Sequence, residues 1–318
     1  MRENIKGSEF SHRPVLLRET IEGLNIRPGG VYIYCTAGGG GHSYEIAKRL
    51  TGGGRLICID RDADAISAVR ERLRDFGDKV VIIQENFVNL AHIAERLGID
   101  RADGIMMDLG VSSHQLDRAE RGFSYNADAP LDMRMDRDNP LDAQTVVNSY
   151  PEEDLCRIIR DYGEERFARR IASRIAESRQ RSPIESTGEL VRIIKEAILP
   201  AARIDGPHPA KRTFQAIRIE VNGELDVIAP AIDGAVRILS AGGRLAVITF
   251  HSLEDRIVKQ TFQGYVRGCT CPRDFPVCVC GERPMIKIVN RKPIVSDKTE
   301  LEENPRARSA KLRIAEKL

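Results

Sequence analysis

The chain has 318 residues, 42% of them hydrophobic, which is enough apolar material for about two domains of roughly 150 residues each. Its 49 basic residues against 47 acidic ones leave a net charge of +2, which excludes a histone-like polycation but permits a local basic face. No apolar run approaches the roughly 18 residues of a membrane helix, and the 7 cysteines are an odd number in a chain without a hydrophobic leader. We therefore expect a cytoplasmic protein that does not bind membranes.

Short β-branched runs alternate with helical periodicity between residues 31 and 110. Strands are expected at 31–35, 55–60, 79–84 and 103–109, and helices at 43–50, 62–76 and 90–97. Strict alternation of strand and helix implies parallel strands, right-handed crossovers and helices on both faces. The predicted fold class is therefore α/β, with a Rossmann-like, doubly wound, mostly parallel sheet.

The alternation stops after Asp108. Residues 110–140 contain Gly110, Gly122, Pro130 and Pro140 among many polar residues, which predicts a long functional loop. Residues 151–199 are helical and arginine-rich, which predicts an inserted all-α domain. Beyond it we expect a helix over 212–239, a turn at 242–243, a strand at 244–250, a helix to about Phe262 and a basic, loop-rich tail. The predicted boundaries are 1–135 for the first part of the core, 136–208 for the inserted helical domain and 209–318 for the second part.

A glycine-rich turn, Gly38–Gly41 followed by His42, joins the first expected strand to the first expected helix. Glycines let a ligand approach the backbone, and the helix start offers free N–H groups, although a turn needed only for packing has the same sequence. Asp60 ends the second strand, where an acid can accept both hydroxyls of a ribose or simply cap the next helix. Together they predict an adenosine-containing cofactor. Because His42 replaces the third glycine of GxGxxG, a cofactor without pyrophosphate fits better, although these residues alone do not separate NAD from S-adenosylmethionine.

Segments spread over nearly the whole chain carry a more specific signal. They are 12–17, 38–43, 108–113, 115–116, 120–124, 130–136, 162–167, 213–218, 250–255 and 304–308. In this order they resemble the bacterial 16S ribosomal RNA N4-cytosine methyltransferase family, known as RsmH or MraW. The resemblance implies an S-adenosylmethionine-dependent methyltransferase core with an inserted helical domain. It also implies methyl transfer to N4 of a decoding-centre cytidine in 16S rRNA.

The resemblance also implies which residues contact S-adenosylmethionine. These are Gly40, Gly41 and His42 around the methionine end, Asp60 at the ribose, Phe87 beside the adenine, and Asp108 and Gln115 as further contacts. One position departs from the family pattern, because Tyr34 stands where an aspartate that helps hold the cofactor ammonium is usual. Tyrosine is neutral at pH 7, so we expect weakened but not abolished cofactor binding. The alternative function is a non-catalytic RNA-binding ribosome assembly factor.

The chemistry requires alignment of nitrogen, methyl carbon and sulfur, together with a group that accepts a proton from the amine. Asp108 ends a strand at the sheet edge where open α/β folds bind ligands. We expect Asp108, Ser112 and Ser113 with their loop to orient the acceptor amine, although Asp108 can instead cap the next turn. His251 is a second candidate on the substrate side, or else a packed histidine. No catalytic metal is indicated, since transfer from a sulfonium needs none.

RNA binding is expected from the insertion and the tail. Residues 157–181 contain eight arginines against four acids, and arginine suits phosphate forks, although such helices are often only solvated faces. Phe123 and Tyr125 of the long loop are candidates for stacking an extruded base. The expected partner is 16S rRNA within the assembled small subunit.

Four cysteines lie close together near the C-terminus. Cys269, Cys271, Cys278 and Cys280 form a C-x-C-x6-C-x-C pattern. Four thiols in so short a segment predict a structural zinc site, but the one-residue spacers are unusual. Reduced thiols or a redox-labile hairpin remain the alternative.

Overall fold

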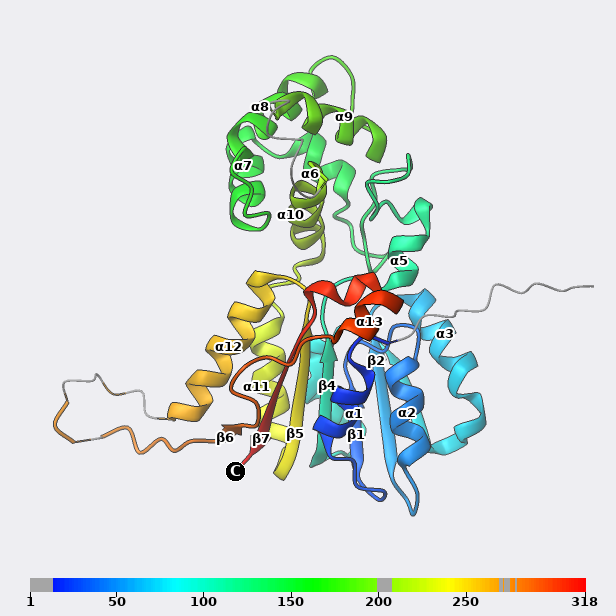
Figure 1. Cartoon of the computed structure of the whole chain (residues 1–318), viewed down its shortest axis with the longest axis vertical. Helices are drawn as coiled ribbons and strands as arrows, with labels where there is room; N and C mark the ends of the chain where they lie inside the picture. Colours follow the sequence, from blue (N-terminus) through cyan, green and yellow to red (C-terminus); the bar gives the residue numbers. More distant parts are fainter. Residues whose placement is uncertain (1–13, 199–207, 269–270, 272–274, 278) are drawn as a thin grey trace, which may run out of the picture. The chain divides into compact units, whose positions relative to one another are not determined.

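The computed structural model describes residues 14–198, 208–268, 271, 275–277 and 279–318 (Figure 1). The chain forms two compact units. The first comprises the chain up to Gly110 together with Asp226–Leu318, and the second comprises Val111–Leu225.

The first unit is built on a seven-stranded sheet in the order β3-β2-β1-β4-β5-β7-β6. The strands are β1 (Val31–Tyr34), β2 (Arg55–Asp60), β3 (Val80–Gln84), β4 (Ala102–Asp108), β5 (Leu239–Thr249), β6 (Ile286–Ile288) and β7 (Lys311–Lys317). Strands β1 to β5 are parallel, whereas β7 pairs antiparallel with β5 and β6. The mostly parallel, doubly wound sheet is confirmed. Chain order reverses between β1 and β4, which is the position where open α/β sheets bind ligands.

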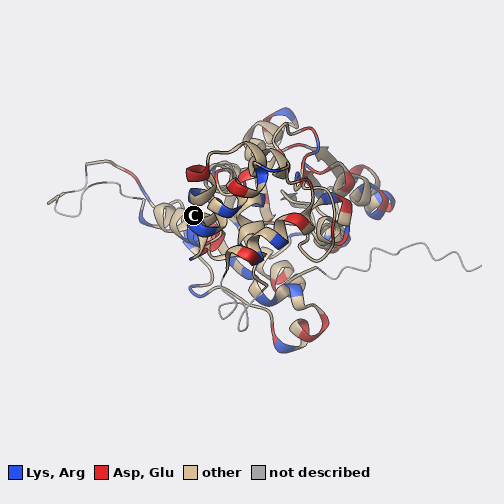
Figure 2. Ribbon diagram, turned by 90° about the horizontal axis from the view of Figure 1, so that it is seen from above, with Lys and Arg blue, Asp and Glu red and all other residues tan. Residues whose placement is uncertain are grey.

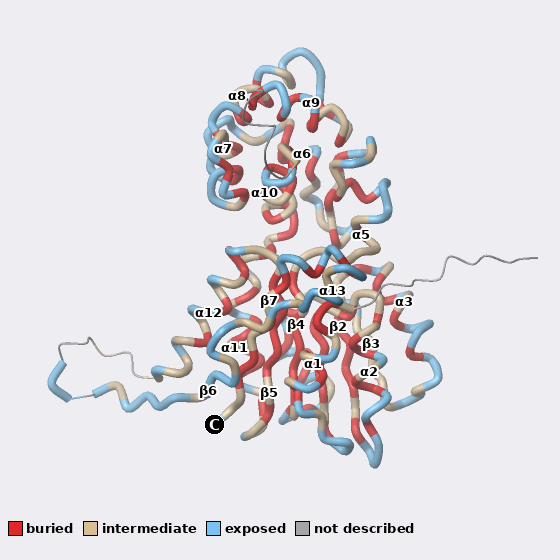
Figure 3. Tube along the Cα trace, in the orientation of Figure 1, coloured by how far each residue is buried: buried red, intermediate tan, exposed pale blue. Residues whose placement is uncertain are grey.

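Helices cover both faces of this sheet because successive strand residues point to opposite sides. Leu56 and Cys58 belong to a buried cluster with α1 (Leu17–Leu24), α2 (Gly41–Arg49) and α3 (Ala63–Leu73). The alternate residues of the same strand, Ile57 and Ile59, are equally buried. Figure 3 shows the central strands mostly in the colour of buried residues. The other helices are α4 (Leu90–Arg96), α11 (Ile228–Ile238), α12 (Ser252–Arg267) and α13 (Lys298–Glu303). Helix α11 packs against α4 and also against α12, which lies beside it in Figure 1. Short 3-10 helices lie at η1 (Arg74–Lys79), η2 (Phe87–Asn89) and η5 (Pro305–Ser309).

Three expectations for the second half of the chain are wrong. The single helix over 212–239 is two helices, because Gly223 adopts φ 58° and ends α10 at Asn222 before α11 begins. The expected turn at 242–243 lies inside the continuous strand β5, where the pairing with β4 shifts in register. The tail is not mainly loop, since residues 311–317 form β7, and Leu312 and Ile314 are buried in the sheet. Buried and more exposed residues alternate at the start of β7, but the five basic residues in the tail made this strand pattern hard to recognise in the sequence.

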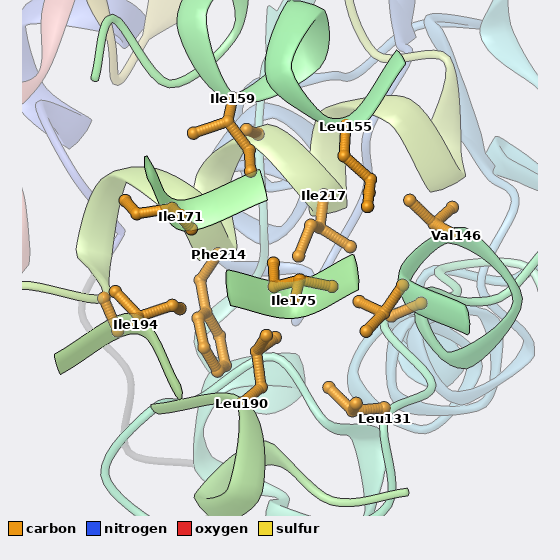
Figure 4. Close-up of a cluster of buried hydrophobic side chains, with 14 of the residues drawn as sticks. Leu131, Val146, Leu155, Ile159, Ile171, Ile175, Leu190, Ile194, Phe214 and Ile217 are labelled. Carbon is orange, nitrogen blue, oxygen red and sulfur yellow. The ribbon is translucent and has the colours of Figure 1, made fainter. Parts of the chain in front are cut away.

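Among its described residues, the second unit contains helices, a long irregular segment at 122–142 and one isolated β-bridge between Pro130 and Ser186. Its elements are α5 (Ser113–Asp117), η3 (Ala119–Arg121), α6 (Ala143–Ser149), α7 (Glu152–Asp161), α8 (Ala168–Arg179), α9 (Thr187–Ala197) and α10 (Lys211–Asn222). Apolar residues three or four apart, such as Ile171 and Ile175 or Leu190 and Ile194, form a common core (Figure 4).

The second unit is wider than the predicted insertion at 136–208. Phe123, Leu131 and Met133 of the expected loop are buried in the same cluster as the helices, and α10 contributes Phe214 and Ile217 to it. This shared core extends the unit to 111–225. Among the residues that the structure describes, no helix is both long and apolar enough to cross a bilayer.

Candidate active site

The three central parallel strands end in polar residues at one edge of the sheet. Tyr34 ends β1, Asp60 ends β2 and Asp108 ends β4. Tyr34 is in register with Cys58 on one side and Met106 on the other. Both carboxylates therefore lie two residues beyond the strand partners of Tyr34, on either side of it.

The glycine turn runs from β1 to α2 along this edge. Gly40 has φ 74° and is the N-cap of α2, a conformation that favours glycine. A Cβ on Gly41 would lie 2.2 Å from Cγ of Pro14, so only glycine fits there. The backbone N–H of Asp108 donates to Oγ1 of Thr36 at 2.7 Å, which ties the turn to β4.

Asp60 is held by backbone donors on both carboxylate oxygens. Gly38 N–H donates to Oδ2 and Asp62 N–H to Oδ1, each at 2.9 Å. The alternative role as helix cap belongs to Asp62, which is the N-cap of α3. Burial raises the pKa of Asp60 to about 6, and the two N–H donors oppose this shift, so the carboxylate predominates above neutrality. Phe87 starts η2 three residues after Gln84, which is in register with Asp60, so both predicted cofactor contacts lie at one corner of the sheet.

Asp108 has an oxygen without a hydrogen bond. Its side chain is 22% exposed, but Oδ1 is buried and has no partner among the described residues. Burial, and then repulsion from Glu254, raises the pKa of Asp108 to about 7, while the Tyr34 hydroxyl lowers it in part. A buried acceptor without a donor is destabilising, so this oxygen is suited to a donor that arrives with a ligand.

His42 and Tyr34 extend inward from Asp108. Nε2 of His42 lies 3.1 Å from the backbone oxygen of Val15, and Nδ1 lies 3.3 Å from the Tyr34 hydroxyl and 3.9 Å from Oδ2 of Asp108. A carbonyl oxygen only accepts, so Nε2 carries the hydrogen and Nδ1 of the neutral ring accepts. The His42 side chain thus contacts Val15 and Tyr34, and its predicted contact with the cofactor stays a prediction.

Glu254 is a site residue that the sequence analysis missed. It follows β5, is 1% exposed, and accepts from the N–H groups of Phe250 at 2.7 Å and His251 at 3.2 Å. His251 is the N-cap of α12 and forms a capping box with Glu254. The sequence signal for this contact is the spacing of a capping box, in which a glutamate follows the N-cap residue by three positions. His251 therefore has a structural contact with Glu254, and its role on the substrate side stays a prediction.

Ser112, Ser113 and Gln115 belong to the second unit. Oγ of Ser112 accepts from the Gln115 N–H at 3.2 Å, and Oε1 of Gln115 accepts from the Ser112 N–H at 2.9 Å. This reciprocal pair is a capping box at the start of α5, and Gln115 is buried. The predicted functions of these three residues stay predictions.

The two aromatic residues of the long loop differ from expectation. Phe123 is 5% exposed within the apolar core, so its expected role in stacking an extruded base is wrong. The ring of Tyr125 already stacks on His208, with centroids 4.6 Å apart and planes 4° apart. One face of Tyr125 is therefore occupied within the unit.

Seven of the eight arginines of residues 157–181 divide into two groups, and the eighth, Arg179, donates to the backbone oxygen of Val147 at 2.8 Å. Arg157, Arg160 and Arg174 form ion pairs with neighbouring acids. Arg166, Arg169, Arg170 and Arg181 are exposed and have no ion pair within the part of the chain that the structure describes. The second group keeps its charge available for a partner.

The cysteine hairpin is only partly covered by the structure. Cys269 and Cys278 lie outside the described residues, and Sγ of Cys271 accepts from the Val279 N–H at 3.4 Å. Structural zinc therefore stays a prediction, for which the zinc content of the purified protein is the measurement.

Comparison with known proteins gives consistent matches along the chain. The model of the MraW methylase family matches residues 9–318. "Ribosomal RNA small subunit methyltransferase H" of Symbiobacterium thermophilum is 58% identical over 309 residues, which are 97% of this chain and 97% of that protein. The protein of the same description in Brevibacillus brevis is 57% identical and covers 97% and 98%. An rRNA methylase structure from Streptococcus thermophilus aligns with a TM-score of 0.41 at 11% identity, over 95% of this chain and 92% of that one.

Proposed function

Since this chain belongs to the MraW methylase family, we propose how its residues carry out S-adenosylmethionine-dependent methylation of N4 of a cytidine in small-subunit 16S ribosomal RNA. The observation that carries the proposal is the buried, unpartnered Oδ1 of Asp108 at the sheet edge between β1 and β4. Methylation requires an acceptor for the amine proton, and a carboxylate oxygen without a donor is such an acceptor.

The residues at this edge fit the cofactor. Asp60 offers two carboxylate oxygens to ribose hydroxyls, and the glycine turn lies beside it, because the Gly38 N–H donates to its carboxylate. Bound S-adenosylmethionine supplies a methyl group already activated by its sulfonium. Phe87 supports the adenine from the neighbouring corner of the sheet. No metal is required by this set of residues.

Asp108 holds the exocyclic amine and accepts its proton. The cytosine amine is a weak nucleophile because its lone pair is delocalised into the ring, so fixed orientation and proton acceptance both lower the barrier. Only the ionised carboxylate can accept, and with a pKa of about 7 Asp108 is ionised in a large fraction of molecules at neutral pH. Ser112 and Ser113 position the acceptor through their loop, and Gln115 contacts the cofactor.

Tyr34 weakens cofactor binding in this chain without abolishing it. The phenol is neutral and buried, whereas the family usually places a carboxylate here. Calorimetric titration of S-adenosylmethionine into the wild type and Tyr34→Asp compares the two side chains directly. Equal affinities would show that this position does not set cofactor affinity.

The substrate is the RNA of the assembled small subunit in the cytoplasm. The exposed arginines without ion pairs, Arg166, Arg169, Arg170 and Arg181, bind its phosphates. A structured RNA surface fits arginines that are dispersed over a helical unit better than a short single strand does.

Asp108→Asn tests the proposal, because the amide keeps the size of the side chain but cannot accept a proton. Single-turnover methyl transfer to undermethylated small subunits, at saturating cofactor, should fall by about 10²–10⁴-fold. Mapping of methylated nucleosides identifies the modified position. Near-normal transfer by Asp108→Asn would contradict the role of Asp108. RNA binding without any transfer by the wild type would instead support the assembly-factor alternative.

A further inference from the structure

The main-chain hydrogen bonds between β1 and β4 end just before Asp108. The last of them runs from the Cys35 N–H to the Met106 oxygen at 2.9 Å. The next N–H of β4 that faces β1 is that of Asp108, because alternate residues of a strand pair with opposite neighbours. Its acceptor, at 2.7 Å, is the side-chain oxygen Oγ1 of Thr36. A hydroxyl therefore takes the place of a carbonyl where the chain leaves β1 for the glycine turn.

The residue after Asp108 is held on the other side. Asp108 is in register with Ile248 of β5, and the Leu109 N–H donates to the Ile248 oxygen at 3.0 Å. Two donors in succession thus fix the end of β4, one on the β1 side and one on the β5 side. Of these two bonds, the one to Thr36 has a side-chain acceptor, so a single substitution removes it and leaves the main chain unchanged.

The same short segment reaches the other carboxylate of the site. The Ala37 N–H donates to the Ile59 oxygen, and the Gly38 N–H donates to Oδ2 of Asp60, both at 2.9 Å. Thr36 directly precedes these two residues, so three consecutive residues make hydrogen bonds to the ends of β2 and β4. One stretch of backbone therefore links the two strand-end carboxylates.

We propose that Thr36 is a positioning residue for methyl transfer: its hydroxyl oxygen holds the backbone of Asp108 and thereby places the unpartnered Oδ1 against the acceptor amine. The inference rests on the proposed function, in which Asp108 holds that amine. An aspartate side chain has two rotatable bonds beyond its backbone, so a fixed N–H restricts where Oδ1 lies. A misplacement of about 1 Å is enough to lower a rate by about 10²-fold.

Thr36→Val tests the proposal, because valine has the shape of threonine but offers no acceptor. Single-turnover methyl transfer to undermethylated small subunits, at saturating S-adenosylmethionine and pH 8.5, should fall about 10–100-fold. The pKa of Asp108 is about 7, so its carboxylate is mostly ionised at this pH and protonation does not explain the loss. The cofactor dissociation constant, measured by calorimetry, should change by less than about threefold. An unchanged rate would overturn the proposal, whatever the change in cofactor affinity.

Two further variants separate positioning from a general loss of structure. Thr36→Ser restores an acceptor and should return the rate to within about threefold of the wild type. Thr249→Val is the matched control, because Thr249 is a buried threonine at the end of β5 whose hydroxyl donates to the Lys311 oxygen at 3.4 Å. It should leave the rate within about twofold of the wild type. A loss as large as that in Thr36→Val would contradict a specific role for Thr36.

A double-mutant cycle with Asp108→Asn shows whether Thr36 acts through Asp108. Thr36→Val should lower the residual rate of Asp108→Asn by less than about threefold, because the carboxylate that it positions is already absent. Losses that multiply in the double variant would overturn the proposal.

Hydrogen exchange supplies a readout that does not depend on catalysis. The Asp108 amide should exchange at least about tenfold faster in Thr36→Val than in the wild type, and Thr36→Ser should restore its protection. Equal exchange in the wild type and Thr36→Val would overturn the assigned contact. The two proposals fail in different ways: normal transfer by Asp108→Asn contradicts the proposed function, whereas normal transfer by Thr36→Val beside an impaired Asp108→Asn contradicts only the positioning role.

Discussion

The edge of the sheet and the helical second unit place their charged residues in opposite environments. At the sheet edge, Asp60 and Asp108 are largely buried, and the pKa values of both are raised because burial disfavours the carboxylate. In the second unit, Arg160 and Arg174 lie on the surface beside acids of the same or a neighbouring helix. Figure 2 shows basic and acidic segments close together along the ribbon.

The two environments distinguish two kinds of charged residue. The buried carboxylates destabilise the folded state, which indicates a functional role, whereas the surface arginines only keep the surface solvated. An exposed ion pair contributes about 0–1 kcal/mol and is replaceable. A buried carboxylate oxygen without a donor, such as Oδ1 of Asp108, lowers stability, so its presence is explained by chemistry rather than by packing. The apolar core stabilises the second unit, whereas the buried acids at the sheet edge destabilise the first unit.

The largest expected effect lies in the core of the second unit. Phe214 is buried in the common helical core, so Phe214→Ala leaves a cavity there (Figure 4). It should lower the free energy of unfolding by about 3–5 kcal/mol in urea titrations. Phe275→Ala is the control, because Phe275 is exposed. A loss below about 1 kcal/mol for Phe214→Ala would contradict the assigned core.

Asp108→Asn should do the opposite and stabilise the protein at pH 8. The folded-state pKa of about 7 lies above the ordinary value of 3.8, so the stability associated with protonated Asp108 is present at low pH. It is lost as the pH rises through about 7, by roughly 2–4 kcal/mol in total. Urea titrations should show a gap between Asp108→Asn and wild type that is larger at pH 8 than at pH 5. Parallel profiles would show that Asp108 is not destabilised by burial.

We expect arginines without an ion pair to contribute more to RNA affinity than arginines that are paired with acids. Replacing Arg166, Arg169 and Arg170 with alanine should weaken binding to small-subunit RNA about tenfold and reduce the salt slope by about 2–3. The matched control replaces the paired Arg157, Arg160 and Arg174, which removes the same net charge. It should change affinity by less than about threefold. Equal losses would show that only net charge matters.

The smallest effect is expected at the capping box of α5. Ser112→Ala removes the oxygen that accepts from the Gln115 N–H, and it should lower the free energy of unfolding by about 1 kcal/mol. Methyl transfer should fall more than this loss explains if Ser112 also positions the acceptor. Ser112→Asp, which keeps a capping oxygen, should restore stability, and failure to do so would contradict the capping role.

Part of the site could be predicted from the sequence, because it depends on patterns among neighbouring residues. The alternation of β-branched runs with helical stripes predicted the parallel strands. The polar residue that ends each strand predicted Asp60 and Asp108 at one edge, since parallel strands share that edge. The expectation that Phe123 stacks a base was wrong, because the sequence of a polar loop does not show whether an aromatic residue in it is buried or exposed.

By itself, the sequence determined the fold class, the glycine turn and the two strand-end carboxylates, because periodicity and strand order depend on neighbours along the chain. Only the tertiary structure decided that Tyr34 contacts His42, that the Val15 carbonyl sets the tautomer of that ring, and that Glu254 accepts from the N–H groups of Phe250 and His251. These contacts join residues that different strands and loops bring together. Their hydrogen-bond geometry and burial arise from the packing of the whole unit, and no local pattern encodes them.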